Sequence, residues 1–113
     1  MKELSTVIEI THLRSGEVKK VLAEQFVFEP LIERGAPGVL YNCSKDINIE
    51  KVDKTMRDRF ATTQSCIVKF KDNKGQYYVI GDKLMPAKVT INNYLGSDLL
   101  SMECKMLTNP LNV

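Results

Sequence analysis

Apolar and polar residues alternate along the second half of this chain, a pattern typical of half-buried β-strands. Residues 65–71 show it most clearly. The predicted inward side chains there are Cys66, Val68 and Phe70, and the outward ones are Lys69 and Lys71. The turn-forming residues 72–75 follow, so residues 76–80 are predicted to return as the second strand of a hairpin.

Two further strands are predicted towards the C-terminus. Residues 87–92 alternate with Ala87, Val89 and Ile91 inward. Residues 100–106 carry Leu100, Met102, Cys104 and Met106 on one face. Gly96 lies within the turn predicted between these two strands.

The first half of the chain alternates less regularly. A strand is predicted over residues 4–13, with Thr6, Ile8, Ile10 and His12 on one face, and a second over residues 18–22 after a turn at Gly16. A helix over residues 17–26 competes for the second segment, and the strand is favoured. Short extended segments are also predicted over residues 25–29, 39–43 and 47–52.

One segment predicts a helix. Asp53 suits the N-cap of a helix over residues 54–61, in which Met56 and Phe60 are four apart and would share a buried face. Residues 31–38 are predicted as a long loop, because glycine and proline punctuate them. About seven short strands then predict a mainly β single domain over residues 1–113, an antiparallel β-sandwich or partly closed β-barrel with one short helix near residues 53–61.

Length and charge narrow the class of function. The 113 residues are enough for one domain, and a 43% hydrophobic fraction is that of an ordinary folded protein. Sixteen Lys and Arg residues against 14 Asp and Glu residues leave a net charge of +2, too small a surplus to indicate a polyanionic partner by itself.

Side chains that perform catalysis or bind metals are sparse. Cys43, Cys66 and Cys104 are odd in number and too far apart for a C-x-x-C pair, so they are interpreted as small apolar residues in a reducing compartment. His12 is the single histidine, which argues against a Cys–His pair or a zinc site, and the glycines form no phosphate-binding loop. We therefore expect a protein that is not an enzyme, with no catalytic residue, cofactor or metal.

The N-terminal residues do not have the pattern of a signal peptide, because Glu3 and Glu9 occupy its expected apolar run. No uninterrupted run approaches 18 apolar residues. We expect synthesis in a cytoplasm and no membrane partner.

The hairpin predicted over residues 69–78 carries a combination of side chains that other small barrels use for single-stranded nucleic acid. Lysines there would contact phosphates and tyrosines would stack on bases; the residues are Lys69, Lys71, Lys74, Tyr77 and Tyr78. The favoured interpretation is that the lysines form the solvent side of an amphipathic strand, where they also discourage sheet-to-sheet aggregation. Binding of single-stranded nucleic acid is therefore kept as the alternative function.

Four features follow one another in a fixed order from residue 66 to residue 91. They are Cys66-Ile67-Val68-Lys69-Phe70, the turn Asp72-Asn73-Lys74-Gly75, the run Tyr77-Tyr78-Val79-Ile80-Gly81, and Pro86-Ala87-Lys88-Val89-Thr90-Ile91. This layout resembles the small β-rich neck and tail proteins of tailed bacteriophages and prophages of Bacteroides-type hosts. Leu84-Met85 departs from it, since the similar proteins more often have a polar-aromatic pair before the proline.

The resemblance covers residues 60–110, and it implies a non-enzymatic structural subunit of the virion, a ring-type component of the neck or tail. The expected partners are further copies of the chain and other virion proteins. Two segments are candidate contact arms: loop 31–38 and the tail 106–113, with Met106, Leu107, Leu111 and Val113 as candidate subunit contacts. A third interpretation is an uncharacterised bacterial interaction module.

Overall fold

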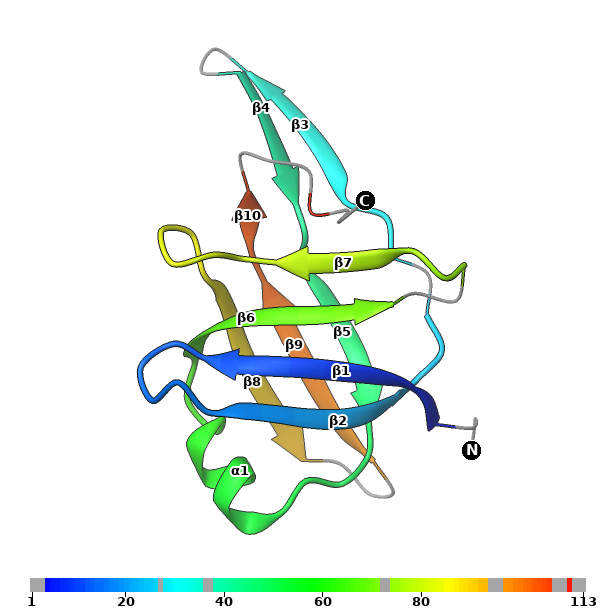
Figure 1. Cartoon of the computed structure of the whole chain (residues 1–113), viewed down its shortest axis with the longest axis vertical. Helices are drawn as coiled ribbons and strands as arrows, with labels where there is room; N and C mark the ends of the chain where they lie inside the picture. Colours follow the sequence, from blue (N-terminus) through cyan, green and yellow to red (C-terminus); the bar gives the residue numbers. More distant parts are fainter. Residues whose placement is uncertain are drawn as a thin grey trace.

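The computed structural model describes residues 4–26, 28–35, 38–71, 74–93, 97–106 and 110 (Figure 1). Its elements, in chain order, are β1 (Leu4–His12), β2 (Val18–Glu24), β3 (Leu31–Gly35), β4 (Gly38–Asn42), β5 (Lys45–Ile49), α1 (Lys54–Arg59), β6 (Gln64–Lys71), β7 (Tyr77–Ile80), β8 (Ala87–Asn93), β9 (Asp98–Glu103) and β10 (Lys105–Met106). Neighbouring strands in both sheets run antiparallel. The predicted mainly β class with one short helix is confirmed.

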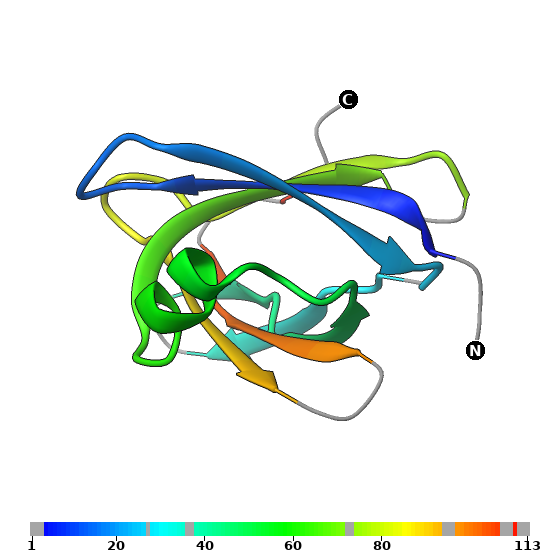
Figure 2. The same ribbon diagram turned by 90° about the horizontal axis from the view of Figure 1, so that it is seen from below.

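The larger sheet curls into two layers. Its strand order is β1-β2-β5-β9-β8-β6-β7, and β6 also pairs with β1. Figure 2 shows β1, β2, β6 and β7 in one layer, across the interior from β5, β8 and β9. The seam between β2 and β5 is short, with Ala23 opposite Ile49 and the Glu50 N–H donating to the Leu22 carbonyl at 2.8 Å. The sheet is therefore only partly closed and does not form a complete barrel.

The space between the two layers holds the core that alternation predicts. The inward residues assigned from sequence on β1, β6, β8 and β9 are buried, among them Ile8, Ile10, Val68, Phe70, Val89, Ile91, Leu100 and Met102. Phe28 joins them and contacts Phe70 and Tyr78 edge to face, at ring-centroid distances of 5.2 and 4.8 Å. Such contacts add specific geometry to the burial of apolar surface.

The competing helix over residues 17–26 does not form, since residues 18–24 are strand β2. The helix predicted after Asp53 is confirmed. The Asp53 Oδ1 atom accepts from the Met56 N–H at 2.9 Å, and both Met56 and Phe60 are buried. The predicted last strand is interrupted at Cys104, where the chain passes from the larger sheet into the smaller one.

The secondary structure of two segments was predicted wrongly. Residues 31–38 are not a loop, because β3 and the first residue of β4 occupy most of them and pair from Leu31 opposite Asn42 to Gly35 opposite Gly38. Residues 25 and 26 and residues 28–30 join no strand ladder. In this segment Phe28 enters the core, and Pro30 has no N–H to donate to a sheet.

The smaller sheet, of order β10-β4-β3, lengthens the molecule. The chain measures 43 × 31 × 22 Å along its principal axes, and the β3–β4 hairpin projects along the longest of these (Figure 1). The fold thus consists of a curled sheet with one protruding hairpin.

Candidate functional site

The protruding hairpin exposes large aliphatic side chains. We call residues 31–35 and 38–42 the arm. Leu31 is 64% exposed, Ile32 49% and Val39 39%. Among the strands that the structure describes, β3 is the last of its sheet, so one of its backbone edges has no described strand beside it. Exposed aliphatic side chains beside an open strand edge are typical of a surface that binds another protein.

The base of the arm is fixed to the rest of the molecule. Tyr41 packs against the core and lies opposite Met106 in the β4–β10 ladder. The Glu33 carboxylate forms an ion pair with Lys105 at 3.4 Å. The arm therefore leaves the globule in a defined direction, with its exposed apolar residues held away from the core.

A second surface feature lies on the outside of the layer formed by β2, β1, β6 and β7. The strand registers place Lys20, Glu9 and Lys69 in one row across the sheet. In the next row, Val7 lies opposite Leu22 and Lys71 opposite Tyr77, and extending the β1–β6 register by one residue from Ile8 and Phe70 brings Val7 beside Lys71. Residues directly opposite on neighbouring strands point to the same face, so both rows lie on the outer surface.

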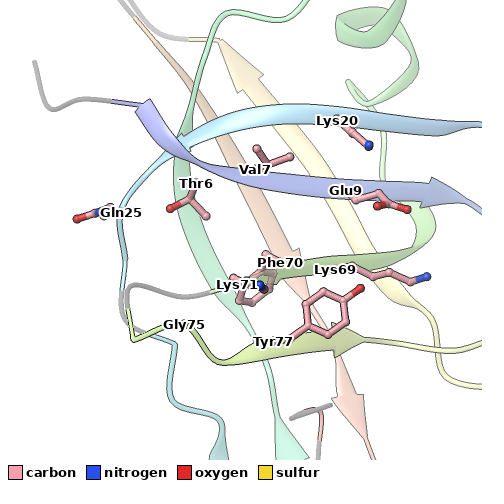
Figure 3. Close-up of a pocket in the computed structure, with 10 residues that line it drawn as sticks. All are labelled: Thr6, Val7, Glu9, Lys20, Gln25, Lys69, Phe70, Lys71, Gly75 and Tyr77. Carbon is pink, nitrogen blue, oxygen red and sulfur yellow. The ribbon is translucent and has the colours of Figure 1, made fainter. Parts of the chain in front are cut away.

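These rows border a shallow cavity of about 540 Å³, which we call the groove. Its lining includes Val7, Glu9, Lys20, Lys69, Lys71 and Tyr77 (Figure 3). Val7 is 50% exposed, and its neighbour Leu22 is also exposed. The groove thus combines exposed apolar side chains with lysines, and Lys71 lies between Val7 and Tyr77.

The rim of the groove has a surplus of positive charge. Three lysines surround one carboxylate, that of Glu9. Within the described part of the chain, no ion pair shorter than 4 Å engages Lys20, Lys69 or Lys71. Their ammonium groups are therefore free to meet an acidic ligand.

The structure separates the five residues predicted for nucleic-acid contact. Lys69, Lys71 and Tyr77 lie together in the groove. Lys74 instead pairs with Glu29 at 3.9 Å. Tyr78 is 5% exposed, and its hydroxyl donates to the Phe28 carbonyl at 3.3 Å, so it is not available to stack on a base. Adjacent strand residues point to opposite faces, which is why the two tyrosines cannot share one surface.

The predicted subunit contacts in the tail are only partly described. Met106 is buried, and its sulfur accepts from the Gly81 N–H at 3.3 Å, so this side chain belongs to the chain's own core. Leu107, Leu111 and Val113 lie outside the described residues. Among the candidate contact segments, the arm is therefore the one whose exposed side chains can be described.

Sequence reasoning missed Val7, Glu9, Lys20 and Leu22 as groove residues. The local signal was present, since alternation placed Val7 and Glu9 on the face of their strand opposite Ile8 and Ile10. The pairing of β1 with β6 brings them beside Lys69 and Lys71 across about 60 residues of chain, and no local pattern predicts that contact.

The buried polar residues serve local structure and lie away from the groove. His12 accepts at Nδ1 from the Ser15 N–H at 3.1 Å, and its Nε2 lies 2.9 Å from Gln64 Oε1. Asp98 accepts from the Val52 N–H at 3.1 Å and from Lys51 at 3.2 Å. These contacts hold the β1–β2 turn and the segment before α1.

In the described ranges, no three side chains of His, Cys, Asp or Glu gather closely enough to hold a metal ion. None of the helical residues described here forms a helix long and apolar enough to cross a membrane. Comparison with protein-family models, with curated proteins and with solved structures found no match for this chain.

Proposed function

We propose that this protein is a non-enzymatic structural subunit of a bacteriophage particle, a neck or tail component that assembles with copies of itself and with other virion proteins. The sequence layout from residue 66 to residue 91 supports the bacteriophage assignment. The arm supports the mode of action, because it offers a surface for protein contact.

The exposure of Leu31, Ile32 and Val39 carries the proposal. Fully burying an aliphatic side chain of this size stabilises by about 1.5–3 kcal/mol relative to leaving it in water. These three side chains are only partly exposed, so an isolated monomer forgoes part of that stabilisation at each of them, whereas a subunit that seats its arm on another protein recovers it.

Sedimentation velocity of wild type and of the double variant Leu31→Ser with Ile32→Ser tests the proposal. We expect wild type to form species heavier than a monomer and the arm variant to lose them. Leu84→Ser is the matched control, because Leu84 is 93% exposed but lies outside the arm. If the arm variant sediments like wild type, or the control loses the heavy species equally, the arm is not the contact.

Binding of single-stranded nucleic acid is the second candidate, supported by Lys69, Lys71 and Tyr77 on the groove. It has less support, because Tyr78 is buried and Glu9 lies between two of the groove lysines. Fluorescence anisotropy with labelled oligonucleotides tests it. The hypothesis requires binding that weakens steeply with salt and is lost in Lys69→Ala with Lys71→Ala; binding unaffected by the substitutions contradicts it.

A further inference from the structure

We infer that the arm of one copy docks into the groove of the next, so that the contact between subunits runs head to tail. The inference rests on the proposed self-assembly and names the surface that receives the arm. Its basis is the match in chemistry between two surfaces of the same chain.

On one face of β3, exposed Leu31 is followed by Glu33, and Glu29 precedes Leu31 by two residues, whereas Ile32 points to the other face, opposite Tyr41. The groove has the complementary arrangement. Val7 and Tyr77, with Leu22 adjoining, provide apolar surface; Lys71 lies between Val7 and Tyr77, and Lys20 and Lys69 flank Glu9 in the next row. A leucine flanked by two acids therefore fits a surface on which apolar side chains and lysines are neighbours, and charge complementarity fixes its orientation.

The present ion pairs of the two carboxylates do not oppose this docking. Glu29 pairs with Lys74 at 3.9 Å and both side chains are exposed, whereas Glu33 pairs with Lys105 at 3.4 Å through Oε1, an atom that is itself buried. An exposed ion pair contributes little to stability, so Glu29 can exchange Lys74 for a groove lysine at little cost, and Glu33 can keep Lys105 at Oε1 while its second oxygen meets a groove lysine.

The arm does not face the groove of its own chain. Its strand β4 leads into β5, which lies in one layer with β8 and β9, whereas the groove lies on the outer surface of β1, β2, β6 and β7 (Figures 1 and 2). Docking of the arm in the groove therefore requires a second copy.

A symmetric pairing of β3 with β3 of another copy is disfavoured by its charges. Antiparallel registers centred on Glu33 or Arg34 place two like charges directly opposite, and a register centred on Leu31 places Glu33 opposite Glu29. The register centred on Ile32 places Arg34 opposite Pro30, which has no N–H for the ladder. The groove offers the arm opposite charges instead.

A head-to-tail contact uses two different surfaces on every subunit. Each copy therefore offers a free arm at one end of a chain of subunits and a free groove at the other. Repetition gives a closed ring if the rotation closes, and a helical filament if it does not.

Charge reversal tests the inference. The acid-reversal variant is Glu29→Lys with Glu33→Lys, which changes the carboxylate just before the arm and the one within it, and the groove variant is Lys69→Glu with Lys71→Glu. Light scattering should find each variant alone at the 12.8 kDa of a monomer, because each repels its own second surface. An equimolar mixture should assemble again, since every arm then meets a groove of opposite charge. The control Lys83→Glu with Lys88→Glu reverses two exposed lysines outside the groove and should assemble like wild type.

Three results would overturn the inference: a groove variant that assembles like wild type, a mixture that stays monomeric, or oligonucleotide binding that the groove variant loses while its assembly is intact. The first leaves the proposed function standing, whereas a monomeric wild type removes the proposed function itself. Thermal unfolding checks that each variant folds. If either variant does not fold, the pair is replaced by Leu31→Ser with Ile32→Ser, which lacks a working arm, and Val7→Ser with Leu22→Ser, which lacks a working groove. A mixture of these two should stop at dimers, because only one kind of arm and one kind of groove remain to meet.

Discussion

Gly81 is a residue at which the fold leaves no room for a side chain. It follows β7 with a φ of +88°, and a Cβ atom there would lie 2.6 Å from the Ala87 nitrogen and 3.1 Å from the Cys66 carbonyl oxygen. Both neighbours are backbone atoms and cannot rotate away. Gly75 has a similar φ of +80°, but a Cβ atom there would meet nothing within 4 Å.

We therefore predict that Gly81→Ala lowers the free energy of unfolding by about 3 kcal/mol or more, since backbone strain and a steric clash add together. Gly75→Ala should cost only the strain, about 1–2 kcal/mol. Urea denaturation followed by circular dichroism measures both. Equal losses in the two variants would mean that the close packing of Gly81 against β8 is not rigid.

The three cysteines show how burial changes an ionisable residue. Burial raises the pKa of the Cys43 thiol to about 12, with nearby Cys104 contributing, and it raises the pKa of both Cys66 and Cys104 to about 11. All three are buried, free thiols. In the native protein they therefore stay protonated near neutral pH.

The raised pKa values of the three thiols predict how the free energy of unfolding depends on pH. A thiol in the unfolded chain ionises above its ordinary pKa of about 8.5, but the native thiols do not until about pH 11. Between these two pH values the unfolded state binds fewer protons than the native state. The stability conferred by the protonated native thiols is therefore fully present below about pH 8.5 and is lost as the pH rises towards 11. Each thiol contributes a slope of up to about 1.4 kcal/mol per pH unit.

Urea midpoints between pH 8 and pH 10 should therefore fall, and Cys43→Ala should show a shallower fall than wild type. This comparison isolates the contribution of the Cys43 thiol to the pH dependence. Identical slopes in the two proteins would contradict the raised pKa of Cys43.

At the scale of elements, the segment between β2 and the arm depends on one aromatic side chain. Phe28 is 2% exposed and contacts Phe70 and Tyr78, whereas Phe26 is only half-buried. We predict that Phe28→Ala lowers the free energy of unfolding by about 3–5 kcal/mol and that Phe26→Ala costs clearly less. Urea denaturation measures both, and a loss for Phe26→Ala as large as that for Phe28→Ala would contradict this assignment.

Local pattern predicted those elements that have one buried face. The strands near residues 65–71 and 87–92 follow from their alternation, and the Asp53 cap follows from its position before Met56 and Phe60. The arm could not be predicted in this way. Leu31, Ile32 and Val39 are all exposed, so its strands show no alternation of burial, and its glycines resembled those of a loop. The groove needed the pairing of β1 with β6, which no local signal carries.

At the scale of the whole molecule, the chain separates a packed body from two outward surfaces of complementary chemistry. The apolar core lies between the two layers of the curled sheet. The arm is fixed at its base by Tyr41 and the Glu33–Lys105 ion pair, and the groove lies on the outer surface of the other layer. In the assembly that we propose, each copy would donate one surface and receive another without changing its own fold.

Self-assembly is the central claim, and the molar mass of the wild-type chain in solution tests it most directly. Light scattering over a rising concentration series should give masses that climb from the 12.8 kDa monomer to defined multiples of it. A mass that stays at 12.8 kDa up to the highest concentration reached would contradict the account, because the exposed arm would then have no second copy to bind.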